Sequence, residues 1–211
     1  CELIDMEMVQ FHPSGMVLPE EFAGTLVTEA VRGEGGKLLN NKGERFMINY
    51  DCERMELSTR DRVAMANYQE IAEGRGTAKG GVYLDISHKS KEFILKKIPS
   101  IYKQFLEIQK LDISKEPMEV APTAHYSMGG IFVHPEDHCT SIRGLFAAGE
   151  VAGGLHGANR LGGNSLAEIL VFGQRAGLAA VKYSKKSRIQ IRSDWSIKKA
   201  HEKINSFSKK G

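Results

Sequence analysis

The order of hydrophobic and polar positions in the first part of the chain predicts short strands and turns. Residues 3–11 are typical of a strand, which we expect to leave extended geometry at His12-Pro13. Residues 24–36 predict a short helix closed by glycines, and the following hairpin turns at 41–43. Residues 82–86 alternate hydrophobic and polar side chains, as a half-buried strand does.

Helices are predicted between and after these strands. Ser58 and Asp61 have the spacing of a capping box, for a helix that runs to about Ala72. Two helices with polar faces follow the 82–86 strand and are separated at Pro99. Up to about residue 117 the pattern therefore predicts a compact α+β unit.

The remainder of the chain has a different pattern. Residues 123–133 and 144–150 predict strands separated by an irregular loop, and the second is wholly apolar, as a strand buried on both faces is. Residues 164–183 predict a helix that the capping pair Ser165 and Glu168 opens. Its many alanines and glycines allow close packing.

The loop before this helix, in the segment GLHGANRLGGNSLAE (154–168), crowds glycines around a single arginine, Arg160. Such glycines let the backbone approach a ligand closely, and a helix N-terminus favours negative charge. The segment therefore predicts a site for an anion or a nucleotide cofactor. No G-x-G-x-x-G motif follows a strand and precedes a helix in this sequence, so the dinucleotide fingerprint itself is not present.

The last thirty residues are basic, with ten Lys and Arg against Asp194 and Glu202. Hydrophobic residues recur there at helical spacing after Ser193, a possible N-cap. We therefore interpret this tail as an amphipathic helix with a solvated basic face, and expect neither nucleic-acid binding nor membrane insertion.

Composition is that of an ordinary globular protein, with 211 residues and 41% hydrophobic residues. Three widely spaced cysteines predict no disulfide framework. His134, His138 and Cys139 lie close together, but their acidic neighbours indicate a solvated turn rather than a metal site. No secretory signal or membrane-spanning run is evident, so we expect a soluble intracellular protein.

Residues able to do chemistry gather in five short motifs. These are FHPSG with His12, TEAVRGEGG with Thr28, Glu29 and Arg32, STRD with Arg60, TAHYSMGG with His125, and GANRLGGNSL with Arg160. On a helix, the three residues of the second motif would share one face. Each motif alone has a structural explanation, because lone histidines and helical ion pairs are common.

Together and in this order, the motifs resemble the flavoprotein subunit of succinate dehydrogenases and fumarate reductases, and less closely L-aspartate oxidase. The resemblance runs from about residue 3 to 181. It implies FAD as the cofactor, a dicarboxylate substrate, and an α+β fragment that comprises the capping domain and the C-terminal half of an α/β FAD-binding domain. Its domains would be 1–13 and 121–183 of the FAD-binding domain, 14–120 of the cap, and 184–211 at the start of a helical domain.

The resemblance also implies roles for individual residues. His12, Thr28, His125 and Arg160 match positions that hold the two substrate carboxylates. Arg60 matches the residue that transfers the substrate proton, with Glu29 and Arg32 as its relay to solvent. Flavin contacts match Glu150, Asn164, Ser165 and Leu166. An arginine fork suits a carboxylate because it offers two charge-assisted hydrogen bonds.

The sequence departs from the family at two points. The usual HPT is HPS here, which keeps the hydroxyl. The family's N-terminal βαβ unit for the ADP half of FAD, the histidine segment that can carry flavin covalently, and most of the helical domain have no counterpart among these residues. We therefore expect a fragment of a longer flavoprotein.

Three functions remain open from the sequence. The first is interconversion of succinate and fumarate, the second is L-aspartate oxidation, and the third is a non-catalytic capping or assembly piece. For the first, we expect the partner to be an iron–sulfur or other electron-transfer subunit. We also expect a cytoplasmic location, peripheral on the inner face of the membrane through partner subunits.

Overall fold

The structure is a computed structural model that describes residues 1–187 and 193–208. Its strands are β1 (Leu3–Ile4), β2 (Val9–Met16), β3 (Lys37–Leu39), β4 (Val82–Asp85), β5 (Met118–Ser127) and β6 (Gly130–Ile131). Its helices are α1 (Ala30–Gly33), α2 (Met47–Tyr50), α3 (Arg60–Ala72), α4 (Lys91–Lys97), α5 (Pro99–Gln109), α6 (Asn164–Lys186) and α7 (Asp194–Ser208), with 3-10 turns η1 (Glu20–Phe22) and η2 (Met55–Leu57).

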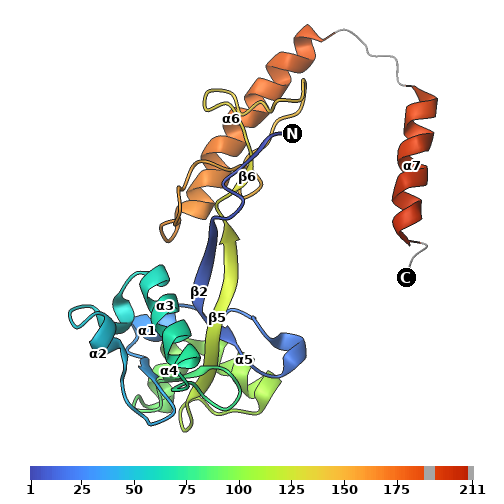
Figure 1. Cartoon of the computed structure of the whole chain (residues 1–211). Coiled ribbons are helices and arrows are strands. Elements are labelled where there is room, and N and C mark those ends of the chain that lie inside the picture. The colour runs from blue at the N-terminus through green and yellow to red at the C-terminus, as the bar shows by residue number, and fades with distance from the viewer. Residues whose placement is uncertain (188–192, 209–211) are drawn as a thin grey trace.

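Two antiparallel sheets organise the chain. The larger has the order β2-β5-β4-β3, and the smaller pairs β1 with β6. The two longest strands, β2 and β5, extend from the part that holds α1 to α5 to the part that holds β6 and α6 (Figure 1). Elements far apart in the sequence therefore meet along these two strands.

A single hydrophobic core lies on the larger sheet and the helices around it. Its residues run from Met16 to Val120, and the fully buried members on the sheet include Leu38, Leu84 and Met118. Val82, Leu84 and Ile86 are all buried, which confirms the alternation predicted for residues 82–86. The mixed α and β content of this part agrees with the predicted fold class.

Several predicted elements are confirmed near their predicted bounds. Helix α3 ends at Ala72, and α4 and α5 are separated at Pro99, which is the first residue of α5. The hairpin turn closes where the Gly43 N–H donates to the Asn40 carbonyl at 3.0 Å. Its second strand is reduced to one bridge between Leu39 and Arg45, because β3 pairs along its length with β4 instead.

The strand predicted for residues 3–11 begins at Leu3 as expected, but it is interrupted and its predicted end was wrong. Residues 5–8 form a turn, and β2 continues through His12-Pro13 as far as Met16. The register of β2 against β5 shifts between His12 and Gly15. This irregularity accommodates a proline that has no N–H to give to the ladder.

The helix predicted for residues 24–36 is much shorter than expected. It covers only Ala30–Gly33, and the chain leaves it through Gly35, whose φ of +101° confirms closure by glycine. Thr28 precedes the helix and Glu29 is its N-cap residue. Thr28, Glu29 and Arg32 therefore do not share one helical face.

Both predicted capping boxes were wrong. Thr59 is the N-cap residue of α3, and Gly163, in the left-handed conformation, is that of α6; neither makes a side-chain capping bond. Asp61 instead accepts a hydrogen bond from Asn159 Nδ2 at 3.0 Å. Glu168 faces the interior, where other side chains bind it.

The strand predicted for residues 144–150 is also wrong. Phe146 makes one isolated bridge with Cys139, and Leu145 is exposed rather than buried. Among the described residues no strand lies alongside this segment to complete a sheet. A buried apolar strand needs such neighbours on both edges and faces.

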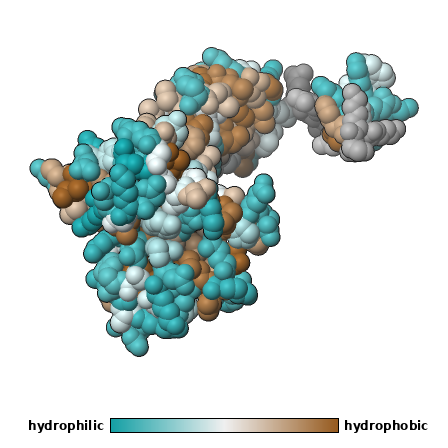
Figure 2. All heavy atoms as spheres, turned by 60° about the horizontal axis from the view of Figure 1, so that its bottom comes forward, coloured by the Kyte–Doolittle hydropathy of each residue, from teal (hydrophilic) through white to brown (hydrophobic). Residues whose placement is uncertain are grey.

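The last two helices are amphipathic. Ser193 caps α7 as predicted, since its Oγ accepts a bond from Ser196 N at 3.3 Å. Exposed hydrophobic side chains gather over the part of the molecule that contains α6 (Figure 2), where Leu166, Leu170 and Leu178 are exposed. No helix in the described ranges is long and apolar enough to cross a bilayer.

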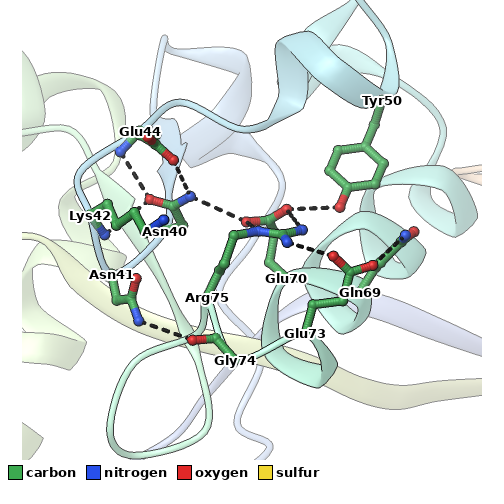
Figure 3. A network of polar contacts seen from close by, with 10 residues as sticks. All are labelled: Asn40, Asn41, Lys42, Glu44, Tyr50, Gln69, Glu70, Glu73, Gly74 and Arg75. Atoms are coloured by element: carbon green, nitrogen blue, oxygen red, sulfur yellow. Dashed lines mark hydrogen bonds and ion pairs between the residues drawn. The ribbon is translucent and has the colours of Figure 1, made fainter.

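A buried polar cluster, which we call the Glu70 clamp, joins α3 to the loops around it (Figure 3). Arg75 binds both oxygens of Glu70, with Nε and Nη2 at 2.9 and 2.7 Å. Tyr50 and Asn40 also donate to the Glu70 carboxylate, at 2.8 and 3.3 Å. The clamp thereby fixes the end of the helix that begins with Arg60.

Candidate active site

His12 on β2 and His125 on β5 lie next to each other where the two long strands pair. Their ring centroids are 5.2 Å apart, at an angle of 60°. His12 is only 1% exposed, and its Nδ1 accepts a hydrogen bond from Ser14 N at 3.2 Å. In neutral His12 the proton therefore lies on Nε2, which is left as a donor.

Both histidines favour the neutral form. Burial, together with the charges of Arg32, His125 and Arg60, lowers the pKa of His12 to about 4. Burial also lowers the pKa of His125, assisted by Arg60 and Arg160. At neutral pH each ring can therefore donate one hydrogen bond without carrying a charge of its own.

Arg60 is the first residue of α3 and pairs with Glu29. Its Nε donates to Glu29 Oε2 at 2.8 Å, and this hydrogen bond lowers the pKa of the Glu29 carboxyl. Arg60 Nη1 is buried and has no partner among the described residues. Because a buried unpaired donor is costly, this atom is available to an anionic ligand.

Arg32 lies deeper than Glu29. It is 5% exposed, and its Nη1 donates to the Glu56 carbonyl at 2.6 Å, whereas the Glu29 side chain is 49% exposed. Burial lowers the pKa of Arg32, and the Glu29 charge opposes this shift. Glu29 is thus the member of the Arg60–Glu29–Arg32 group that faces solvent.

Arg160 is held in place by the residues on each side of its loop. Its Nη2 donates to Gln10 Oε1 at 3.1 Å, and Gln10 Nε2 donates to the Arg160 carbonyl and to Asn159 Oδ1, both at 2.6 Å. The guanidinium carbon lies 4.3 Å from the centroid of the Tyr126 ring. Arg160 Nε is buried and unpartnered within the described ranges.

The loop that carries Arg160 meets the Arg60–Glu29 pair at Gly162. A Cβ placed on Gly162 would lie 3.6 Å from Arg60 Nη2 and 3.9 Å from Glu29 Oε1. Two arginines, each with a buried free donor, and two neutral histidines therefore approach one another. This set of donors suits a ligand that carries two separate negative charges.

The structure gives Thr28 only a local bond, which its Oγ1 accepts from Ala30 N at 3.4 Å. The remaining predicted residues lie around the start of α6. Glu150 Oε1 accepts a bond from Ser127 N at 2.9 Å, and residues 164–166 form the first helical turn. Asn164 and Leu166 are exposed and Ser165 is half-buried.

Sequence reasoning missed Gln10, Tyr126 and His156, and assigned Glu168 to a cap. Gln10 lies two residues before His12 and on the same face of β2, so the strand period carried a signal for it. Tyr126, His156 and Glu168 carried no such signal, because they meet only through folding.

Around His134, the chain forms the predicted turn, in which Asp137 Oδ1 accepts a hydrogen bond from Cys139 N at 3.1 Å.

The FAD binding domain family matches residues 1–166 of this chain. This chain belongs to that family. Within it, the chain resembles the flavoprotein subunits of fumarate reductases and succinate dehydrogenases, as its motifs predicted. FAD is the cofactor of the family.

The similar proteins agree with this assignment. One subunit of the CoM/CoB fumarate reductase of Methanothermobacter marburgensis is 60% identical over 92% of this chain and 35% of its own length. The 8-methylmenaquinol:fumarate reductase flavoprotein subunit of Wolinella succinogenes is 50% identical over 85% of this chain and 29% of its own. The chain thus spans about a third of the length of these relatives.

Solved structures share the fold. An E. coli quinol fumarate reductase FrdA variant superposes with a TM-score of 0.83 at 38% identity, over 98% of this chain and 37% of its own. Sdh1 of Mycobacterium smegmatis gives 0.76 at 49% identity, over 96% of this chain and 34% of its own.

The described residues fit the flavin end of FAD. Helix α6 begins after Gly163 without a side-chain cap. Of its first three N–H groups, those of Asn164 and Leu166 bond to nearby carbonyls, and only that of Ser165 has no partner among the described residues and is free for an electron-rich ring or an anion. Leu161 and Leu166 are exposed beside this helix end and offer apolar surface to a flat ring. Arg160, with its free Nε, lies in the loop that leads into the same helix end.

Proposed function

We propose that this chain is the substrate-binding part of an FAD-dependent flavoprotein that interconverts succinate and fumarate. The observation that carries the proposal is the meeting of Arg60 and Arg160, each with a buried and unpartnered guanidinium nitrogen, beside His12 and His125. A dicarboxylate would supply a charged acceptor for Arg160 and bring its reacting carbon to Arg60.

Four residues hold the substrate in this proposal. Arg160 binds one carboxylate, and His12, His125 and Thr28 bind the other through neutral donors. Each hydrogen bond to a charged group contributes about 1.5–3 kcal/mol. Neutral histidines suit this role, because the two arginines already supply the positive charge.

Arg60 transfers the proton to and from the substrate carbon. Arginine is a weak acid, with an ordinary pKa above 12, so a base must return its proton quickly. Glu29 is placed for this, because its carboxylate binds Arg60 Nε at 2.8 Å and its side chain is half-exposed to solvent. The hydrogen bond from Arg60, assisted by the charge of Arg32, lowers the pKa of the Glu29 carboxyl and keeps it ionised.

FAD, when bound, supplies hydride transfer. The residues that face it in this proposal are Glu150, Asn164, Ser165 and Leu166. The free Ser165 N–H in the first turn of α6 would stabilise negative charge on the flavin, as helix N-termini do for anions.

The remaining assignments follow from the same family likeness. We propose that residues 14–120 form a capping domain, 1–13 and 121–183 a part of the FAD-binding domain, and 184–211 the start of a helical domain. The single core over Met16–Val120 supports the first of these. An iron–sulfur or other electron-transfer subunit is the partner that a flavoprotein subunit needs, and a cytoplasmic location stays a prediction.

The test is Arg60→Ala in the complete flavoprotein. We expect bound flavin, its reduction by an artificial donor and dicarboxylate binding to persist, because none of these needs the transferred proton. Turnover of fumarate should fall by about 10²–10⁴, as is typical when a positioned acid or base is lost.

Arg54→Ala, at an exposed arginine outside the site, serves as the control and should keep normal turnover. Near-normal fumarate reduction by Arg60→Ala would show that the proton comes from another group. Assays with L-aspartate beside succinate separate this proposal from L-aspartate oxidase, and an inactive complete protein would leave only the assembly function.

A further inference from the structure

Three buried side chains outside the proposed substrate and flavin contacts form a hydrogen-bonded chain under Arg160. Glu168 on α6 is 5% exposed, and its Oε2 lies 2.5 Å from the Tyr126 hydroxyl and 2.9 Å from His156 Nε2. The His156 ring also meets the Tyr126 ring edge-on, with centroids 5.7 Å apart. One carboxylate thus joins β5, the 154–163 loop and α6.

The hydroxyl end of Tyr126 is fixed by this carboxylate. Burial, together with the Glu168 hydrogen bond and charge, raises the pKa of Tyr126 to about 12. The phenol therefore stays neutral and donates to Glu168. Since the side chain cannot swing away without breaking that bond, the ring stays beside the Arg160 guanidinium, whose carbon lies 4.3 Å from the ring centroid.

His156 fixes the loop from the other side. It precedes Arg160 by four residues, and its bond to Glu168 ties the start of the loop to the first turns of α6. Without such a tie, a segment with this many glycines would have wide backbone freedom. The loop that carries Arg160 is thereby anchored at both His156 and Gln10.

Arg160 itself is held by neutral partners. Its side-chain donors reach the Leu161 carbonyl and the Gln10 amide oxygen, and it forms no ion pair with any carboxylate in the described part of the chain. The arginine is therefore oriented without being neutralised. Its charge stays available to a ligand.

We propose that Glu168 is a positioning residue, which fixes the Arg160 guanidinium for a substrate carboxylate through Tyr126 and His156. The inference rests on the proposed function, because it takes Arg160 as a substrate-binding group. Glu168 touches neither substrate nor flavin in this role. Glu168 affects substrate binding only because it fixes the position of the Arg160 guanidinium.

The experiment compares Glu168→Gln, Arg160→Lys and the double variant in the complete flavoprotein, with the dissociation constant for succinate measured by calorimetry. A glutamine can offer both donors only a neutral amide oxygen where the Glu168 Oε2 accepted them, so both hydrogen bonds lose their charge assistance and weaken. We expect the dissociation constant to rise about tenfold in each single variant. The double variant should be no weaker than Arg160→Lys alone, because both changes remove the same interaction.

Tyr126→Phe gives a second and milder reading, because it keeps the ring and removes only the hydroxyl. We expect the dissociation constant for succinate to rise a few-fold in this variant. Glu53→Gln and Tyr68→Phe, at exposed positions, are matched controls and should bind succinate as the wild type does. A crystal structure of the Glu168→Gln protein without ligand should show the guanidinium displaced from the Tyr126 ring.

The proposal would be overturned if the fold-changes in the dissociation constant of the two single variants multiply in the double variant. It would also be overturned if Glu168→Gln and Tyr126→Phe both bind succinate as the wild type does. If the wild type fails to bind succinate, the proposed function fails. The ligand-free structure then still decides the positioning role, since an unmoved Arg160 overturns it and a displaced one supports it.

Discussion

Burial decides the charge of individual residues at this site. His12 and His125 lie beside arginines, and both have a pKa that burial lowers. The positive charge of the site is therefore concentrated on Arg60, Arg32 and Arg160, which stay protonated at any physiological pH. Among the described residues, the Glu29 carboxylate is a neighbour of both Arg60 and Arg32. Arg160 has no neighbouring carboxylate in the same part of the chain.

The His12 assignment gives a direct prediction. In histidine-labelled NMR spectra of the complete flavoprotein, the signal lost in His12→Gln should titrate near pH 4. The unfolded chain binds this proton near pH 6.5, so the folded state loses stability as pH falls from about 6.5 to about 4. The loss from one histidine is at most about 1.4 kcal/mol per pH unit.

His134→Gln is the control for that experiment, because His134 is exposed and lies outside the site. A His12 signal that titrates at or above pH 6.5 would mean that water reaches the ring. The neutral-donor role proposed for His12 would then be wrong.

Among the elements, α3 is the one that places Arg60, and the Glu70 clamp fixes its far end (Figure 3). Glu70 is buried, and hydrogen bonds from Arg75 hold the pKa of its carboxyl below the ordinary value. This stabilisation is complete above the ordinary carboxyl pKa. It is lost as pH falls below that value, through the lowered pKa of the folded state.

We predict that Glu70→Gln lowers the free energy of unfolding by about 1–3 kcal/mol, because buried donors lose a charged acceptor. Glu73→Gln is the matched control. It removes an exposed partner of the same Arg75, where an ion pair contributes about 0–1 kcal/mol. Thermal unfolding of the complete flavoprotein measures both, and equal effects would show that the buried position of Glu70 gives it no special role.

At the scale of the whole molecule, the proposed function assigns to the described residues the flavin end of a cofactor site and the substrate donors. Helix α6 exposes a hydrophobic face at Leu166, Leu170 and Leu178, and no described residue covers those side chains. The chain spans about a third of its relatives.

We therefore predict that the purified 211-residue chain binds FAD weakly or not at all. The reason is that these residues contain no G-x-G-x-x-G between a strand and a helix, which would hold the pyrophosphate. The absorbance spectrum of the purified chain measures this, with the complete flavoprotein as control. Stoichiometric yellow flavin on the 211-residue chain would contradict the prediction.

Local signals in the sequence determined much of this protein. The motifs around His12, Arg60 and Arg160 predicted the family, and the period of residues 82–86 predicted a strand of the core. Turn and helix-ending residues such as Gly35 and Pro99 also lie where their backbone preferences predicted. These features depend on neighbours in the chain, so the sequence alone carries them.

Tertiary contacts decided the rest. Pro13 stays in a strand because β5 pairs with His12 before it and with Gly15 after it, across a register shift. Residues 144–150 are no strand because none of the described residues completes a sheet beside them. Glu168 has the spacing of a cap, yet it lies in the interior because Tyr126 and His156 supply two donors there. A charged side chain takes the position where its hydrogen bonds are best satisfied, and only the folded chain determines which donors those are.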